Sequence, residues 1–252
     1  KERMQFALTD AVESNSVNVL EILDCDGSYY NLAVVDPKDI LKDKDVYINA
    51  NTKTITFKSW EQGENGRVAV ANSFGHCVTV RSGNTLQVMD GLLSTVNNVF
   101  VETNANFIPK AKNEADKSEI TIGGNLENAG TTTHGADILI IKQNLNNLAD
   151  ATFKSNKNFN VEGNVATFGT FDSKGAENKV VGNFTQDDVN SSTTFAPQTT
   201  TTINGTFACF AGSFERLGLN GGNNYRATVN VGKLGATDGT TTTAWPTEMH
   251  NN

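Results

Sequence analysis

The residues of this sequence best suited to acid–base chemistry are a few carboxylates and basic side chains. They are Glu102, Asp137 and Glu162, together with Lys142, Arg81 and Arg216. A glycoside hydrolase needs paired carboxylates roughly 5–10 Å apart, and a polysaccharide lyase needs a lysine or arginine base beside acidic groups. The candidates are sparse, and Gly123 and Val181 interrupt the series in which they occur. Carbohydrate cleavage is therefore the alternative hypothesis, and we assign no residue a catalytic role.

The histidines and cysteines do not form a metal-ligand pattern. They are His76, His134 and His250, and Cys25, Cys77 and Cys209. No CxxC or HxxxH spacing occurs, and the odd number of cysteines favours buried free thiols. The stretch DCDGS at 24–28 has the Asp-x-Asp-Gly order of a calcium loop, but Val35 stands where the loop requires glutamate, so a solvated turn is expected. The sequence therefore predicts no metal site and no cofactor.

The composition favours many short strands joined by turns. The 252 residues include 22 Gly and 4 Pro, and both Asn and Thr are abundant. Thr suits strands, whereas Asn and Gly suit corners. The net charge of −8 argues against nucleic acid or an anionic membrane surface as a partner. No apolar run is long enough to span a membrane.

The clearest pattern is a repeat with a period near 20 residues. Apolar residues that end strand-like phrases recur at Val80, Val101, Ile122, Ile141, Val161, Val180 and Ile203. An asparagine follows each of the first six after three or four places, at Asn84, Asn104, Asn125, Asn144, Asn164 and Asn183. Because an apolar residue and an amide keep the same period, the repeat is a structural unit.

A unit of this length fits one coil of a parallel β-helix. It is too short for ankyrin or tetratricopeptide units and lacks a leucine-rich pattern. Successive coils lie about 4.8 Å apart, so equivalent residues stack in rows. The apolar row then fills the core, and the asparagines form a ladder of amide hydrogen bonds. The preceding glycines are expected to have the positive φ of a tight corner, at Gly83, Gly124, Gly163, Gly182 and Gly205.

Other residues are assigned to the outer or inner side of the coils. Lys142 and Glu162 are expected to be neighbours on the outer face, either as a cross-strand pair or as an accidental solvated pair. The threonine runs at 131–133, 199–202 and 240–243 suit exposed strands or loop tips. Most phenylalanines of the C-terminal half are expected in the core: Phe168, Phe171, Phe184, Phe195, Phe207, Phe210 and Phe214. Exposed contacts are expected from Tyr29, Tyr30, Trp60, Tyr225 and Trp245.

The two ends of the chain depart from the repeat. We predict a cap over residues 1–45, with a helical face in 4–15 and a strand at 17–23; a separate small domain is the alternative. The β-helix is predicted over 46–235, with about eight or nine coils, of which 54–60 and 67–74 form the first. Residues 236–252 are a polar tail, with Trp245 placed against the open end.

The stretch NFNVEGNVATFGTFDSKGAENKVVGNFTQDDVNSSTTFAPQTTTTINGTF (158–207) resembles the repeats of bacterial secreted adhesins and autotransporter passenger domains. Those repeats also alternate Gly-Asn-apolar corners with strands rich in Thr, Ser and Asn. The resemblance extends over about residues 80–235. It implies an all-β, single-stranded, right-handed parallel β-helix on or outside a bacterial cell, and it identifies no functional residue.

These observations together favour a non-enzymatic module. We expect an extracellular or cell-surface structural or adhesive domain of a bacterial protein, with carbohydrate or a host or matrix surface as its ligand. The alternative is a polysaccharide lyase or glycoside hydrolase built on the same architecture, by analogy of fold. Catalytic carboxylates gathered in one or two rows would favour the enzyme, whereas outer rows of Thr and Asn favour the binding module.

Overall fold

The computed structural model describes residues 18–23, 29–34, 46–48, 54–63, 66–69, 71–73, 77–95, 97–109, 118–219 and 225–235. Side chains are described at 77–86, 95, 97–109, 119–219 and 225–235. The helix predicted within 4–15, the calcium-like stretch 24–28 and the tail 236–252 lie outside these ranges. The boundaries predicted at residues 45 and 235 therefore stay predictions.

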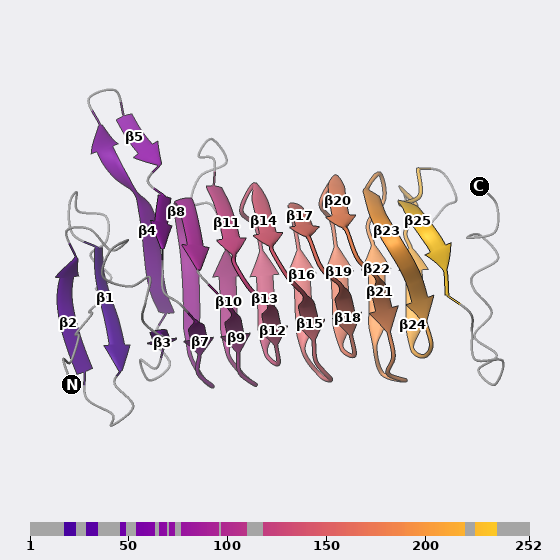
Figure 1. The fold of residues 1–252 in the computed structure, drawn as a ribbon, viewed down its shortest axis with the longest axis horizontal. Helices are drawn as coiled ribbons and strands as arrows, with labels where there is room; N and C mark the ends of the chain where they lie inside the picture. The colour runs from indigo at the N-terminus through magenta and orange to yellow at the C-terminus, as the bar shows by residue number, and fades with distance from the viewer. Residues whose placement is uncertain are drawn as a thin grey trace.

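The chain winds into an all-β parallel solenoid, as the repeat predicts (Figure 1). It has about six regular turns with a spacing near 21 residues. Together with the less regular first windings, the described residues place eight strands on each face, which agrees with the eight or nine coils expected. A regular coil contributes one strand to each of three faces, and each strand pairs in parallel with its counterparts in the coils before and after it. Inward and outward side chains alternate along each strand because successive residues point to opposite sides of a sheet.

The strands of each face follow one another along the solenoid axis. The first face contains β3 (Val46–Ile48), β7 (Val78–Val80), β9 (Val99–Val101), β12 (Leu126–Asn128), β15 (Leu145–Asn147), β18 (Val165–Thr167), β21 (Phe184–Gln186) and the end of β23 (Thr200–Cys209). The second contains β4 (Thr54–Gly63), the start of β8 (Thr85–Thr95), β10 (Asn106–Pro109), β13 (Thr131–His134), β16 (Thr152–Ser155), β19 (Thr170–Ser173), β22 (Ser192–Phe195) and β24 (Ser213–Arg216). The third contains β6 (Ala71–Ser73), the end of β8, β11 (Ser118–Ile122), β14 (Ile138–Ile141), β17 (Asn158–Val161), β20 (Glu177–Val180), the start of β23 and β25 (Thr228–Leu234).

The N-terminal strands are less regular than the coils. β1 (Asn18–Leu23) and β2 (Tyr29–Val34) form an antiparallel pair, so the strand predicted at 17–23 is confirmed. β4 and β6 pair in parallel with β8, as expected for a first coil. β5 (Gly66–Ala69) instead turns back on β4 as an antiparallel hairpin that projects from the solenoid (Figure 1). The prediction that residues 67–74 belong to a winding of the solenoid is therefore wrong for the residues in β5.

The inward side of the coils is a continuous apolar core. On the third face it contains the predicted row Ile122, Ile141, Val161, Val180 and Ile203, each in register with the next. Seven phenylalanines are the largest fully buried side chains: Phe107, Phe153, Phe159, Phe171, Phe184, Phe195 and Phe207. The rings of the last six contact one another, as in the stacked pair Phe153–Phe171 with centroids 4.9 Å apart. The prediction that most of the C-terminal phenylalanines are core residues holds, but Phe168, Phe210 and Phe214 are only partly buried.

The register predicted for the first two coils is wrong. Val80 and Val101 are partners on the first face, not the third. The next residue in their row is Asn128, whereas Ile122 pairs with Thr95. The connection between β10 and β11 is longer than the corresponding connections of the next four coils, so a repeat counted at constant spacing assigns Val80 and Val101 to the wrong row.

An asparagine ladder runs along the corner between the third and first faces. The Oδ1 atom of Asn125 accepts a hydrogen bond from the backbone N–H of Asn144 (2.9 Å), and Oδ1 of Asn144 accepts one from the N–H of Asn164 (2.9 Å). The ladder continues to Asn183 (2.8 Å) and begins one coil earlier at Asn98, which bonds the N–H of Asn125 (2.8 Å). The predicted row is thus confirmed from Asn125 to Asn183, with backbone N–H groups as the donors along its length. The predicted bonds between amide side chains link Asn144 to Asn125 (3.1 Å) and Asn164 to Asn144 (3.3 Å). Asn84 and Asn104 lie at the corner between the first and second faces. The side chain of Asn84 donates to carbonyls of its own turn, and Asn104 has a positive φ of 62°.

Most of the corner glycines are needed because atoms of the preceding coil lie close to them, and not because their φ is positive. Gly83 has the predicted φ of 79°, but Gly124, Gly163, Gly182 and Gly205 are not among the positive-φ residues of the described part of the chain. A Cβ atom on Gly163 would lie 2.6 Å from Oδ1 of Asn144 in the preceding coil. The predicted conformation is therefore wrong at these four positions. A side chain there would displace the ladder amide of the coil before it.

Removing one amide from the ladder tests its contribution to stability. Asn144→Ala leaves the N–H of Asn164 without its acceptor, and we expect the free energy of unfolding to fall by about 1–2 kcal/mol. Urea unfolding followed by circular dichroism measures the change. Asn156→Ala, at an exposed position outside the ladder, is the control and should alter stability by less than about 0.5 kcal/mol. Equal effects of the two substitutions would show that the ladder does not stabilise the corner.

Candidate functional site

The carboxylates considered for catalysis lie on three different corners. Glu102 follows β9 at the corner between the first and second faces, and Glu162 follows β17 at the corner between the third and first faces. Asp137 lies between β13 and β14, at the corner between the second and third faces. The fold therefore separates these residues and does not make the paired-carboxylate site that a hydrolase requires.

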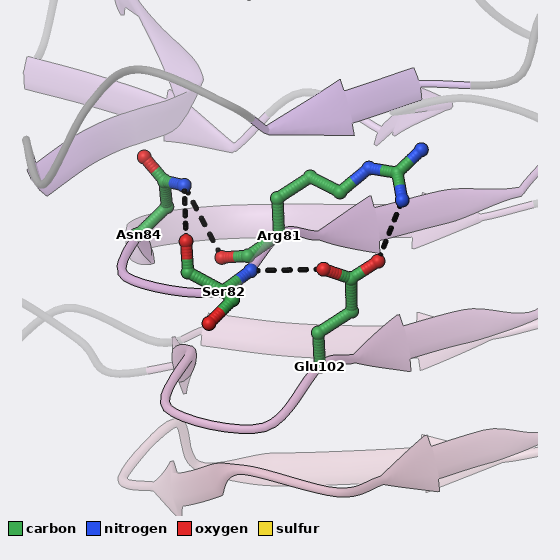
Figure 2. A network of polar contacts seen from close by, with 4 residues as sticks. All are labelled: Arg81, Ser82, Asn84 and Glu102. Atoms are coloured by element: carbon green, nitrogen blue, oxygen red, sulfur yellow. Dashed lines mark hydrogen bonds and ion pairs between the residues drawn. The ribbon is translucent and has the colours of Figure 1, made fainter.

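Two of the carboxylates bind basic residues of a neighbouring coil. Figure 2 shows Oε1 of Glu102 accepting a hydrogen bond from Nη1 of Arg81 (2.7 Å), while Oε2 accepts one from the backbone N–H of Ser82 (2.9 Å). The side chain of Asn84 closes the same turn through the carbonyls of Arg81 and Ser82 (Figure 2). This network joins the corners of two successive coils, which is a structural role for Arg81 and Glu102.

The predicted pair of Lys142 and Glu162 is confirmed. Nζ of Lys142 lies 2.6 Å from Oε1 of Glu162, with the two side chains 45% and 39% exposed. Exposed pairs of this kind contribute about 0–1 kcal/mol to stability. Arg216, the remaining basic candidate, lies at the end of β24 on the second face, apart from this pair.

The potential metal ligands do not converge. Within the described residues, no group of three or more His, Cys, Asp and Glu side chains is placed to hold a metal ion. Cys77 and Cys209 are free and partly buried, and burial raises the pKa of Cys209. His134 points inward from β13 and is fully buried, with Nε2 lying 2.8 Å from the carbonyl oxygen of Asn158. Cys25, His76 and His250 lie outside the described residues.

The most regular surface feature is a row of small polar side chains on the outside of the second face. We call it the hydroxyl row; its members are Thr85, Asn106, Thr131, Thr152, Thr170, Ser192 and Ser213. Each is in register with the next, and all are at least partly exposed. The spacing between parallel strands sets consecutive members about 4.8 Å apart. Hydroxyl and amide groups are therefore presented to solvent as an evenly spaced array.

Buried amides fix the backbone beneath this array. Nδ2 of Asn147 donates to the carbonyl oxygen of Thr170 (2.8 Å), and Nδ2 of Asn128 donates to that of Thr152 (2.9 Å). Nε2 of Gln186 likewise donates to the carbonyl of Ser213 (3.0 Å). All three amide side chains are fully buried. Since a buried carbonyl without a partner costs free energy, these contacts hold the starts of β16, β19 and β24 in position.

Sequence reasoning missed the hydroxyl row and the buried amides. Residues 131–133 were expected on the surface, but Thr132 is fully buried while Thr131 and Thr133 face outward. The members of the row are separated by unequal numbers of residues, because the corners between the first and second faces differ in length and the connection from β10 to β11 is longer than those of the next coils. The row could have been found from the alternation of inward and outward residues in each strand, if positions had been counted from the nearest corner and not at constant spacing along the chain.

The exposure predicted for the aromatic residues Tyr29, Tyr30, Trp60, Tyr225 and Trp245 is confirmed at one described position, and their role as contacts stays a prediction. Tyr225 is 68% exposed. Tyr29, Tyr30 and Trp60 lie in strands whose side chains are not described, and Trp245 lies outside the described ranges. Two phenylalanines expected in the core, Phe168 and Phe210, are instead partly exposed beside the hydroxyl row.

Comparison with known proteins finds no relative from which a function could be inferred. No family model, curated protein or solved structure matches the chain. Among the described residues, no helix is long and apolar enough to cross a membrane.

The buried histidine gives a prediction for the pH dependence of stability. Desolvation lowers the pKa of His134 to about 4, against the smaller opposing effects of the Asn158 carbonyl and Asp137. Because the folded value lies below the ordinary one, the stabilisation is complete above about pH 6.5 and is lost as the pH falls toward 4. This group should lower the free energy of unfolding by about 2 kcal/mol between about pH 7 and pH 5.

Urea titrations at several pH values measure this slope. His134→Gln replaces the imidazole by a group that does not titrate, so its unfolding free energy should change less with pH than that of the parent protein. The readout is the slope, because the substitution also alters packing at every pH. An identical slope in the two proteins would show that His134 does not control acid stability.

Proposed function

We propose that this chain is a non-enzymatic structural or adhesive module of a bacterial surface protein, exposed outside the cell, that binds carbohydrate through the hydroxyl row of its second face. The observation that carries the proposal is the register of the row from Thr85 to Ser213 on the outside of a stacked sheet. A ligand that repeats its own hydroxyl groups can meet several members at once. The extracellular, bacterial setting is supported by the resemblance of residues 158–207 to adhesin and passenger-domain repeats.

A polymeric ligand suits this surface better than a small one. Each solvent-exposed hydroxyl contributes a weak hydrogen bond, since it exchanges a bond to water for a bond to the ligand. Contacts made along one polymer are intramolecular after the first, so their contributions accumulate. The buried amides add to this by keeping the array fixed, which reduces the entropy lost on binding.

The enzymatic alternative is less well supported by the geometry. Glu102, Asp137 and Glu162 lie on separate corners, and two of them bind Arg81 and Lys142. Neither arrangement offers a carboxylate pair across one bound sugar. The uncharged side chains of the hydroxyl row are suited to binding a glycan.

Substitution of the row tests the proposal. Thr131→Val, Thr152→Val and Thr170→Val combined remove three hydroxyls from the second face and keep the shape and strand preference of the side chains. We expect binding to insoluble polysaccharides in a sedimentation assay to weaken more than tenfold, as the loss of several hydrogen bonds of about 0.5–1.5 kcal/mol implies.

The matched control carries Thr121→Val, Thr200→Val and Thr202→Val, which remove three hydroxyls from the outside of the third face. It should bind as the parent protein does. Equal binding by all three proteins, or no binding to any polysaccharide, would overturn the proposal. Release of reducing ends or unsaturated uronates that is lost in Glu162→Gln would favour the enzyme.

A further inference from the structure

A second row lies beside the hydroxyl row, where the first-face strands end at the corner. It consists of Leu148, Phe168, Asp187 and Phe210, which we call the corner stripe. Their backbone N–H groups bond the carbonyls of Asn128, Asn147, Thr167 and Gln186 in the preceding coils, so the four residues stack in register. Leu148 is 40% exposed, Asp187 is exposed, and both phenylalanines are partly exposed.

Within the stripe, Phe168 and Phe210 flank the carboxylate of Asp187, and Leu148 lies one coil before Phe168. Phe168 and Phe210 lie two coils apart, about 10 Å by the strand spacing, with Asp187 in the coil between them. Ala166 and Thr185, two places before Phe168 and Asp187, are partly exposed, whereas Ala208, two places before Phe210, is buried. One pyranose unit of an extended β-linked glycan is close in length to one coil. A glycan lying along the axis would thus meet an aromatic ring at every second sugar and a carboxylate at the sugar between.

The charge of this surface selects among glycans. In five successive coils, the first-face strand and the corner that follows it make up residues 126–130, 145–151, 165–169, 184–191 and 207–212. These segments contain Glu127, Asp150, Asp187 and Asp188 and no lysine or arginine. A surface of one sign attracts ligands of the opposite sign and repels those of its own. Ammonium groups are also attracted to the faces of aromatic rings. Polyuronates are therefore disfavoured, and glycans that carry amines are favoured.

We propose that the corner stripe binds an extended amino-sugar glycan, of the class of β-1,4-linked glucosamine polymers. Phe168 and Phe210 stack on alternate sugars, and Asp187 accepts hydrogen bonds from the ammonium group between them. The inference rests on the proposed function, because the hydroxyl row would contact the same chain along its edge. It goes further by naming the class of sugar and the residues that select it.

The test uses the full chain, chitosan as the cationic glycan, cellulose as the neutral one and alginate as the polyuronate. At mildly acidic pH, where the glucosamine amines are protonated, chitosan should bind most tightly and alginate should not bind. Phe168→Ala and Phe210→Ala should each weaken chitosan binding about fivefold, in line with ring–cation and stacking contacts at exposed sites. Circular dichroism and thermal unfolding establish that the variants are folded.

Asp187→Asn separates a specific contact from general attraction to an acidic protein. It should weaken chitosan binding and reduce its dependence on salt, while leaving binding to cellulose unchanged. Glu177→Gln, which removes one exposed charge from the third face, is the matched control and should have no effect on either. Equal losses in Asp187→Asn and Glu177→Gln would overturn the inference, because net charge alone would then explain binding.

The outcomes also separate this inference from the proposed function. Unchanged chitosan binding by the double variant Phe168→Ala, Phe210→Ala, together with loss in the hydroxyl-row variant, would refute the stripe and retain the carbohydrate-binding function. Alginate binding as tight as chitosan binding would refute the charge argument. Failure of the parent protein to bind any of the polysaccharides would refute both.

Discussion

The stacking of each coil directly on the one before is the constraint on which the rest of the structure depends. A strand in this solenoid finds its hydrogen-bond partners in neighbouring coils, so a residue must be compatible with the residues above and below it in its row. The third-to-first corner shows the consequence most clearly. Oδ1 of Asn144 accepts a hydrogen bond from the N–H of Asn164, and a Cβ on Gly163 would collide with that amide and with the backbone carbonyl of Gln143. The glycine and the asparagine are therefore selected together, one coil apart.

The same constraint connects the interior with the outer surface. Asn147 is fully buried, and its Nδ2 donates to both Oγ1 of Thr167 (3.1 Å) and the carbonyl oxygen of Thr170 (2.8 Å). A buried amide is tolerated only when it is paired, and here its partners are the groups that shape the corner. Thr170 then presents its own side chain outward at a position that its carbonyl contact fixes. The regularity of the hydroxyl row is thus a property of the polar part of the core as well as of the strands.

Much of this architecture could be predicted from the sequence, because a corner that recurs in each coil requires the same residue types at regular intervals along the chain. The amide row from Asn125 to Asn183 and the aliphatic row from Ile122 to Ile203 were both located by spacing alone. Spacing failed where coils differ in length: Val101 was placed in the row of Ile122, although its partner is Asn128. It also failed for the buried amides, since an inward asparagine has the same sequence pattern as an outward one. Only the contacts of a particular corner distinguish the two.

The proposed binding surface is of the kind that a stacked solenoid forms readily, whereas a catalytic site is not. Catalysis needs a few groups from different places to converge on one bond, and here the three corners hold Glu102, Asp137 and Glu162 apart. Repetition along one row is the arrangement that the fold produces without additional elements. It offers many similar contacts that are individually weak, and these become effective when the ligand repeats at a comparable interval. A solenoid with small polar rows is for this reason better suited to hold a polymer along its length than to transform one of its linkages.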